Sequence, residues 1–166
     1  MEIGFTLCFI QHNDKILMLY RNKAPNQFKW NGVGGKIEAG ESPIDSCQRE
    51  IQEETGLHIE KINIQFRAIC TWNKTGGMFV FLAKSSSDQV ISGQEGKLEW
   101  KSLDWIKTSG QAVSNIPIFL PYILDLNNKP IEFAFSYNDD EEMIGYEMLP
   151  DSPLIKNYRE REECQK

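Results

Sequence analysis

The feature that most constrains the fold is the segment of residues 35–57, GKIEAGESPIDSCQREIQEETGL, where glycine-rich sequence gives way to helix-forming sequence. Ser42 and Pro43 are typical of a helix start, because serine accepts hydrogen bonds from free amides and proline fits the first turn. Gly56 stands where a helix often ends in a left-handed residue. The pattern predicts a helix over residues 43–55.

The predicted helix has an apolar face and an acidic face, at about 100° of rotation per residue. The apolar face consists of Ile44, Cys47, Ile51 and Thr55. Glu50, Glu53 and Glu54 crowd a neighbouring arc, and two carboxylates about 6 Å apart repel by roughly 3 kcal/mol at an effective dielectric constant of about 20. The guanidinium of Arg49 cannot neutralise all three, whereas Mg²⁺ binds oxygen ligands and keeps positions open for phosphate. A solvated acidic surface is the alternative interpretation.

The same segment resembles the Nudix box, G-x5-E-x7-R-E-U-x-E-E-x-G-U with U aliphatic. The fixed positions are occupied by Gly35, Glu41, Arg49, Glu50, Ile51, Glu53, Glu54, Gly56 and Leu57. Because every fixed position is met at the right spacing, the resemblance is specific. It implies a loop-helix-loop that binds Mg²⁺ or Mn²⁺ and hydrolyses a nucleoside diphosphate linked to another group.

The resemblance also implies roles for individual residues of the box. The expected metal ligands are the carboxylates of Glu50, Glu53 and Glu54 and the carbonyl oxygen of Gly34. Arg49 and Glu41 are expected to orient these ligands. Glu50 or Glu53 is expected to accept the proton of the attacking water. The predicted catalytic group therefore consists of Glu41, Arg49, Glu50 and Glu53.

Further charged residues are assigned outside the box by the same resemblance. Similar enzymes carry a loop glutamate a few residues before an E-W pair, where it binds metal or positions water. Glu95 is the expected equivalent, with Glu99 as the second choice and a solvated loop residue as the alternative interpretation. Arg21 and Lys36 are expected to contact phosphate, although both are also typical of surface cations.

Residues 30–36, WNGVGGK, followed by the box resemble the larger MutT homologues that destroy oxidised purine nucleoside triphosphates. In those proteins the asparagine of this run hydrogen-bonds the base, a role carried onto Asn31; stabilising a turn is the alternative. Asn115 is a second candidate base reader, and capping the following helix is an alternative or additional role. An amide both donates and accepts, so the two side chains can read a purine edge. The candidate aromatic walls, each of which is also typical of a core, are Phe28, Trp30, Phe79 and Trp105.

The remaining segments alternate between strand-like and polar sequence. Strands are predicted at 3–10, 15–21, from near His58 to Trp72, at 78–84, at 98–106 and as a hairpin over 130–148, with a helix at 116–124 and polar loops at 22–29 and 85–97. The 22–29 loop leads into the run 30–35, whose glycines are expected to allow close approach of the backbone to a ligand. The resemblance implies the Nudix fold, of the α/β (α+β) class: a mixed sheet between helices, with a C-terminal hairpin.

A chain of 166 residues is long enough for one full core and short for two. We expect a single domain over 1–150 and a charged tail, frayed or as a short helix, over 151–166. No apolar run of membrane-spanning length and no basic-then-apolar leader is present, so a soluble cytoplasmic protein is expected. The sequence leaves open whether the protein is a monomer or a homodimer.

The formal net charge is −6, from 18 basic and 24 acidic residues, and no large basic cluster occurs. Binding to polymeric nucleic acid or to a membrane is therefore not expected, whereas a small nucleotide bridged by cations is. The cysteines are scattered without C-x-x-C spacing, which favours reduced thiols over disulfides or a zinc site.

The sequence thus predicts a metal-dependent pyrophosphohydrolase that converts oxidised purine triphosphates, such as 8-oxo-dGTP, to the monophosphate and pyrophosphate, a role in nucleotide sanitation and DNA repair. Attack at the β-phosphorus is expected. One alternative is a Nudix hydrolase for an ADP-sugar, a dinucleoside polyphosphate or a pyrimidine triphosphate. Another is a noncatalytic nucleotide sensor, which would be expected to lack a ligand glutamate.

Overall fold

The computed structural model describes residues 1–165. The strands are β1 (Ile3–His12), β2 (Lys15–Arg21), β3 (Trp30–Asn31), β4 (Val33–Lys36), β5 (Ile64–Trp72), β6 (Gly76–Lys84), β7 (Gly96–Ser102), β8 (Ile131–Tyr137) and β9 (Met143–Leu149). The helices are α1 (Pro43–Thr55), α2 (Leu103–Thr108), α3 (Ile116–Leu124) and α4 (Pro153–Cys164), with a 3₁₀ helix at Lys61–Asn63.

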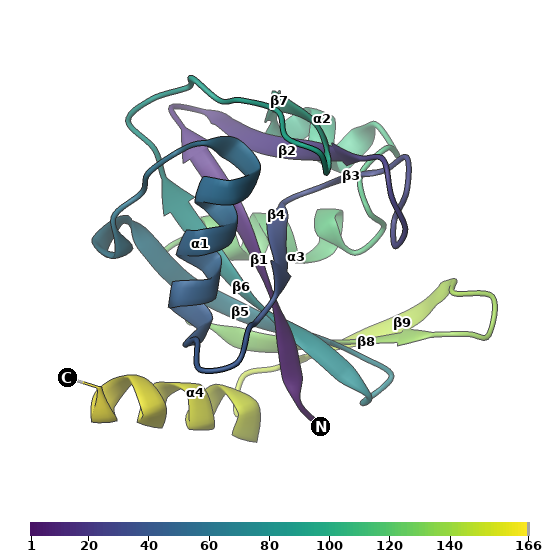
Figure 1. Cartoon of the computed structure of the whole chain (residues 1–166). Coiled ribbons are helices and arrows are strands. Elements are labelled where there is room, and N and C mark those ends of the chain that lie inside the picture. The colour runs from purple at the N-terminus through teal and green to yellow at the C-terminus, as the bar shows by residue number, and fades with distance from the viewer. Residues whose placement is uncertain (166) are drawn as a thin grey trace.

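The strands of the described residues form one mixed sheet. Its main path runs β3-β2-β1-β6-β5-β8-β9, while β4 pairs with β1 and β7 pairs with β2. The β1–β6 and β5–β8 pairs are parallel, and the remaining pairs are antiparallel. The mixed sheet expected from the sequence is confirmed, as is the C-terminal hairpin, which extends away from the rest of the sheet as β8 and β9 (Figure 1).

Helices cover both faces of the sheet (Figure 1). On the face of α1 and α4, Ile51 and Tyr158 belong to one buried apolar cluster. On the face of α2 and α3, Ile106 and Phe119 belong to another. Because successive side chains of a strand point to opposite faces, a strand buried on both sides is apolar throughout. The central strand β1 illustrates this, since Phe9 belongs to the second cluster and Ile10 to the first.

The predicted helix over residues 43–55 is confirmed as α1. The Oγ atom of Ser42 accepts a hydrogen bond from the backbone N–H of Asp45 at 3.2 Å. Gly56 has a φ of 76°, and its backbone N–H donates to the carbonyl of Gln52. This left-handed conformation carries a steric cost for other residues, so both ends of the helix are set by local sequence.

Two of the predicted strand boundaries are wrong. The strand expected over 98–106 ends at Ser102, whose Oγ accepts from the N–H of Trp105 and starts α2. The strand expected from near His58 begins only at Ile64, after the 3₁₀ helix. The glycine-rich run after the 22–29 loop contains the short strands β3 and β4, which pair with β2 and β1.

The C-terminal segment, expected as a charged tail or short helix over 151–166, contains α4. Its Ile155 and Tyr158 side chains are buried against the sheet, and the ring of Tyr158 stacks on Phe66 with centroids 3.8 Å apart. Ser152 caps the helix and also donates to the buried carboxylate of Glu132 at 2.5 Å. This segment therefore contributes to the core beside β5 and β8.

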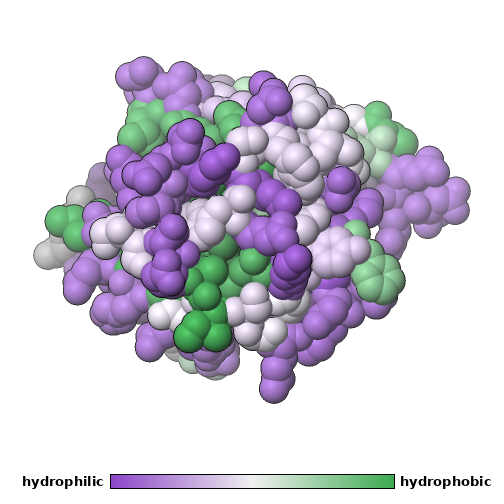
Figure 2. All heavy atoms as spheres, turned by 90° about the horizontal axis from the view of Figure 1, so that it is seen from above, coloured by the Kyte–Doolittle hydropathy of each residue, from purple (hydrophilic) through white to green (hydrophobic). Residues whose placement is uncertain are grey.

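On the face seen from above, hydrophilic residues occupy a larger area than hydrophobic ones (Figure 2). Within residues 1–165 no helix combines the length and apolar character needed to cross a membrane. All four cysteines are free, as expected; Cys8, Cys47 and Cys70 are buried and Cys164 is exposed.

Candidate active site

The box glutamates are placed by the packing of α1 against β4. Ile51 and Cys47 anchor the helix in the core, so the adjacent side of α1 turns Glu50 and Glu54 toward the glycines of β4. A Cβ atom at Gly35 would collide with the carboxylate of Glu50, and one at Gly34 would collide with the backbone of β1. Gly34 thus allows β4 to lie close to β1, and Gly35 leaves room for the carboxylate of Glu50.

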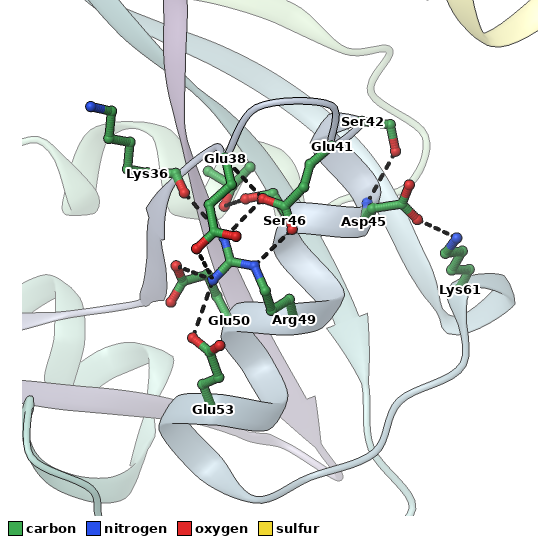
Figure 3. Close-up of polar contacts among 11 residues, drawn as sticks. Lys36, Glu38, Glu41, Ser42, Asp45, Ser46, Arg49, Glu50, Glu53 and Lys61 are labelled. Atoms are coloured by element: carbon green, nitrogen blue, oxygen red, sulfur yellow. Dashed lines mark hydrogen bonds and ion pairs between the residues drawn. The ribbon is translucent and has the colours of Figure 1, made fainter.

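Arg49 lies at the centre of an acidic network (Figure 3). Its guanidinium donates to both carboxylate oxygens of Glu41, at 2.7 and 2.9 Å. It also donates to Glu50 at 3.0 Å, to Glu53 at 3.1 Å and to the backbone carbonyl of Lys36 at 3.2 Å. These hydrogen bonds, those to Glu41 first, hold the pKa of Arg49 above its usual value and lower the pKa of Glu41. The predicted catalytic group Glu41, Arg49, Glu50 and Glu53 is therefore brought together.

The carboxylates of Glu50 and Glu54 lie in poorly solvated positions. Burial raises the pKa of Glu50, against the opposing effect of Arg49. Glu54 is only 7% exposed, and burial together with the charge of Glu50 raises its pKa to about 8. Its Oε2 atom accepts a hydrogen bond from the N–H of Gly34 at 3.1 Å. This hydrogen bond lowers the pKa of Glu54 by less than burial and Glu50 raise it. Either a proton or a cation must accompany these carboxylates.

The loop that carries Glu95 is held on two sides. The N–H of Ile91 donates to the last carbonyl of α1, that of Thr55, at 3.0 Å. Asn22 donates from its backbone to the carbonyl of Glu95 at 3.2 Å and from its side chain to the carbonyl of Gln94 at 3.0 Å. Lys23 forms a 3.8 Å ion pair with the Glu95 carboxylate. Residues 22 and 23 thus connect the first polar loop to the second.

Glu95 is the better supported of the two glutamates considered outside the box. The charges of Glu95 and Arg21 both act on Glu54, the first raising and the second lowering its pKa. Glu99 instead lies between Lys97 and Lys101, at 2.7 and 2.6 Å, and these two lysines lower its pKa.

The donor set fits a hard divalent cation. Carboxylate oxygens and a backbone carbonyl are the ligands that Mg²⁺ and Mn²⁺ prefer, and the raised pKa of Glu54 shows a buried acid that lacks a sufficient counter-charge. Within residues 1–165 no three acidic, histidine or cysteine side chains already surround a single point, because Arg49 holds Glu50 and Glu53. The metal-ligand roles of Gly34, Glu50, Glu53, Glu54 and Glu95 stay predictions. A cavity of about 630 Å³ beside the end of α1 involves none of these residues.

The two candidate base readers lie on neighbouring segments. The N–H of Trp30 donates to the carbonyl of Gln111 at 3.0 Å, and the carbonyl of Trp30 accepts from Val113 at 2.9 Å. Asn31 follows Trp30 directly, and Asn115 comes two residues after Val113. The first asparagine is half-buried and the second is buried.

The side chains of the two asparagines have different hydrogen-bonding environments. The Oδ1 atom of Asn31 accepts from the N–H of Gly32 at 2.8 Å, as expected of a turn-stabilising residue, and this leaves its NH₂ group available to a ligand. Asn115 is the N-cap residue of α3, and its backbone carbonyl accepts from the N–H of Ile118 at 3.0 Å, but its side chain makes no capping hydrogen bond. Its amide instead lies beside Tyr137, opposing the rise in the pKa of that hydroxyl that burial causes.

The aromatic candidates separate into different regions. Trp30 is 7% exposed and packs edge-on against Trp105, with ring centroids 5.8 Å apart. Phe28 is exposed at the end of the 22–29 loop, 6.4 Å from the ring of Tyr20. Phe79 packs against Phe66 and Tyr158 on the α4 face of the sheet, in a different apolar cluster from Trp30. The expectation that Phe79 shares a base pocket with the other aromatic residues is therefore wrong.

Several residues near the site were not identified from the sequence. Asn22 and Lys23 carry no motif, and they matter only because their loop meets Glu95. Tyr137 lies in the predicted C-terminal hairpin, but nothing in the sequence indicates that its hydroxyl lies beside the amide of Asn115. Lys101 had no sequence signal, although its ammonium lies over two tryptophan rings.

Residues 3–120, well over half of the chain, match the NUDIX domain family. An uncharacterised Nudix hydrolase of Bacillus subtilis is 34% identical over 157 residues, covering 87% of this chain and 93% of that protein. The oxidised purine nucleoside triphosphate hydrolase of Danio rerio is 25% identical over 138 residues, covering 81% and 87%. A crystal structure of a MutT protein from Bacillus halodurans superposes with a TM-score of 0.73 at 26% identity, covering 89% of this chain and 98% of that one. Together with the box geometry, these matches show that the chain belongs to the Nudix hydrolase family.

Proposed function

We propose that this protein is a divalent-metal-dependent nucleoside triphosphate pyrophosphohydrolase that acts on oxidised purine nucleotides such as 8-oxo-dGTP. The products are the nucleoside monophosphate and pyrophosphate, so the protein would remove damaged precursors of DNA. The similarity to the Danio rerio oxidised purine nucleoside triphosphate hydrolase, over most of both chains, supports this substrate class.

The observation that carries the proposal is the short distance along the chain between the two halves of the site. Asn31 ends β3, and only Gly32 and Val33 separate it from Gly34, which donates to Glu54. One rigid segment, paired with β2 and β1, therefore presents an amide at one end and the carboxylate cluster at the other. A nucleotide with its base at Asn31 and its phosphates at α1 spans this segment.

The chemistry follows from the residues around the phosphates. Bound Mg²⁺ or Mn²⁺, held by the predicted ligands, supplies positive charge against the phosphates and lowers the pKa of the attacking water. Glu50 or Glu53 accepts the proton of that water. Arg49 keeps both carboxylates oriented. Arg21 and Lys36 are the residues that we propose contact the phosphate oxygens.

Base recognition rests on amide groups. The free NH₂ group of Asn31 can donate to a purine oxygen or nitrogen, and the amide of Asn115 can donate and accept. A site built to hydrogen-bond a base discriminates against analogues that leave its buried groups unpaired. Tyr137 beside Asn115 adds a hydroxyl to that side of the site.

A kinetic panel tests the proposal. We expect kcat/KM for 8-oxo-dGTP to exceed that for dGTP, dCTP and ADP-ribose with saturating Mg²⁺. Equal values for 8-oxo-dGTP and dGTP, or a preference for ADP-ribose, would remove the sanitising role while leaving a Nudix hydrolase. Hydrolysis in water labelled with heavy oxygen tests the point of attack: label in pyrophosphate is expected, and label only in the monophosphate would refute attack at the β-phosphorus.

A further inference from the structure

Lys101 of β7 has an environment unlike that of a surface lysine. Its Nζ atom lies 4.2 Å from the ring centroid of Trp105 and 4.6 Å from that of Trp30. The two rings are perpendicular, at 89°. The Lys101 side chain is only 19% exposed, and its ammonium is paired with Glu99 at 2.6 Å. An ammonium over aromatic faces is attracted by the negative charge of the ring faces, more strongly when partly removed from water.

Trp30 is more than a packing residue, because its backbone joins the two asparagines. Its backbone N–H donates to Gln111 and its carbonyl accepts from Val113. The segment that leads to Asn115 is therefore aligned with the strand that contains Asn31. Any rotation or displacement of Trp30 changes the relative position of the two amides. The side chain of Trp30 is fixed on one side by Tyr20, at 5.1 Å between centroids, and on the other by Trp105 and Lys101.

We propose that Lys101 is a positioning residue for base recognition, holding Trp30 and Trp105 so that Asn31 and Asn115 keep a fixed relative position. This inference rests on the proposed function, since it concerns how the same site selects its base. The ion pair and ring contacts of Lys101 are with Glu99, Trp30 and Trp105, none of which is a ligand in the predicted metal set, and its effect is therefore on nucleotide selection. The chemical step at α1 is expected to be unaffected.

The chain offers a matched control in Lys97. Lys97 lies four residues earlier on the same strand and pairs with the same carboxylate, that of Glu99, at 2.7 Å. Its side chain is 68% exposed, and among the described residues the cation-to-ring contacts involve Lys101 and not Lys97. Comparing the two lysines separates the effect of the aromatic contact from that of the ion pair.

The test compares Lys101→Met, Lys101→Arg and Lys97→Met in steady-state kinetics with 8-oxo-dGTP and dCTP. Methionine keeps much of the apolar stem but removes the charge. We expect Lys101→Met to raise KM for 8-oxo-dGTP roughly fivefold to tenfold with kcat little changed, and to reduce the ratio of kcat/KM values for the two nucleotides by a similar factor. Lys101→Arg and Lys97→Met are expected to keep the parent ratio.

A second pair of variants keeps the inference testable should Lys101→Met unfold. Lys101→Gln and Lys101→Leu both remove the charge with a different side-chain shape, and both are expected to lower the ratio. The inference is overturned if any of these charge-removing variants folds and keeps the parent ratio while Asn31→Ala loses it; the proposed function then stands. If Asn31→Ala and Asn115→Ala also leave the ratio unchanged, base reading by these amides is itself wrong.

Discussion

At the scale of single residues, the buried carboxylate of Glu54 opposes the stability of the metal-free protein. Its folded pKa of about 8 exceeds the ordinary value of 4.5, so the folded state binds the proton more tightly. Stability is therefore full below about pH 4.5 and is lost as the pH rises toward 8. This cost in the metal-free protein is consistent with the cation-binding role that we propose for Glu54.

Glu54→Gln removes this titration. In the presence of a chelator we expect the variant to be more stable than the parent at pH 9, by at most about 5 kcal/mol, and closely similar at pH 4.5. Denaturant unfolding at the two pH values measures the difference. A variant that is less stable than the parent at pH 9 would show that the carboxylate is well solvated or already neutralised. The same variant is expected to lose activation by Mg²⁺.

At the scale of elements, the two polar loops act together through Asn22, whose side chain donates to the loop of Glu95. Asn22→Ala removes that hydrogen bond, which is worth about 1 kcal/mol, and loosens Glu95. We expect the Mg²⁺ concentration for half-maximal rate to rise roughly fivefold. The exposed Asn127, outside these loops, supplies the control Asn127→Ala. An unchanged Mg²⁺ dependence in Asn22→Ala would show that Glu95 takes no part in binding the cation.

The C-terminal helix α4 belongs to the fold through Tyr158, which is 7% exposed and stacked on Phe66. Tyr158→Ala is expected to lower the free energy of unfolding by about 3 kcal/mol, because it leaves a cavity against the sheet. Tyr146, on the neighbouring hairpin, is 48% exposed and provides the matched control, Tyr146→Ala, with an expected loss below about 1 kcal/mol. Similar values for the two variants would mean that α4 does not contribute to the core.

At the scale of the whole molecule, the sequence predicted the features that depend on neighbouring residues better than those that depend on tertiary packing. Helix α1 was predictable because its cap and its terminal glycine act within a few residues. The prediction of a strand beyond residue 102 was wrong because Ser102 caps a helix there, although the residues that follow have a strand-like pattern. The prediction for Phe79 was wrong because β6 is buried on both faces of the sheet, so its sequence does not show which face each side chain occupies. Lys101 meets Trp30 only after the sheet has formed.

The most direct test of the account is whether α1 and its neighbours bind Mg²⁺ together with a nucleotide. Calorimetric titration of Mg²⁺ would use the protein saturated with a purine triphosphate analogue in which a methylene group replaces the oxygen between the α- and β-phosphorus. We expect saturable binding at millimolar Mg²⁺ or below, and its strong weakening in Glu53→Gln with the fold intact. No Mg²⁺ binding by the parent at millimolar concentration, or equal binding by the variant, would contradict the assignment of these carboxylates as the metal site.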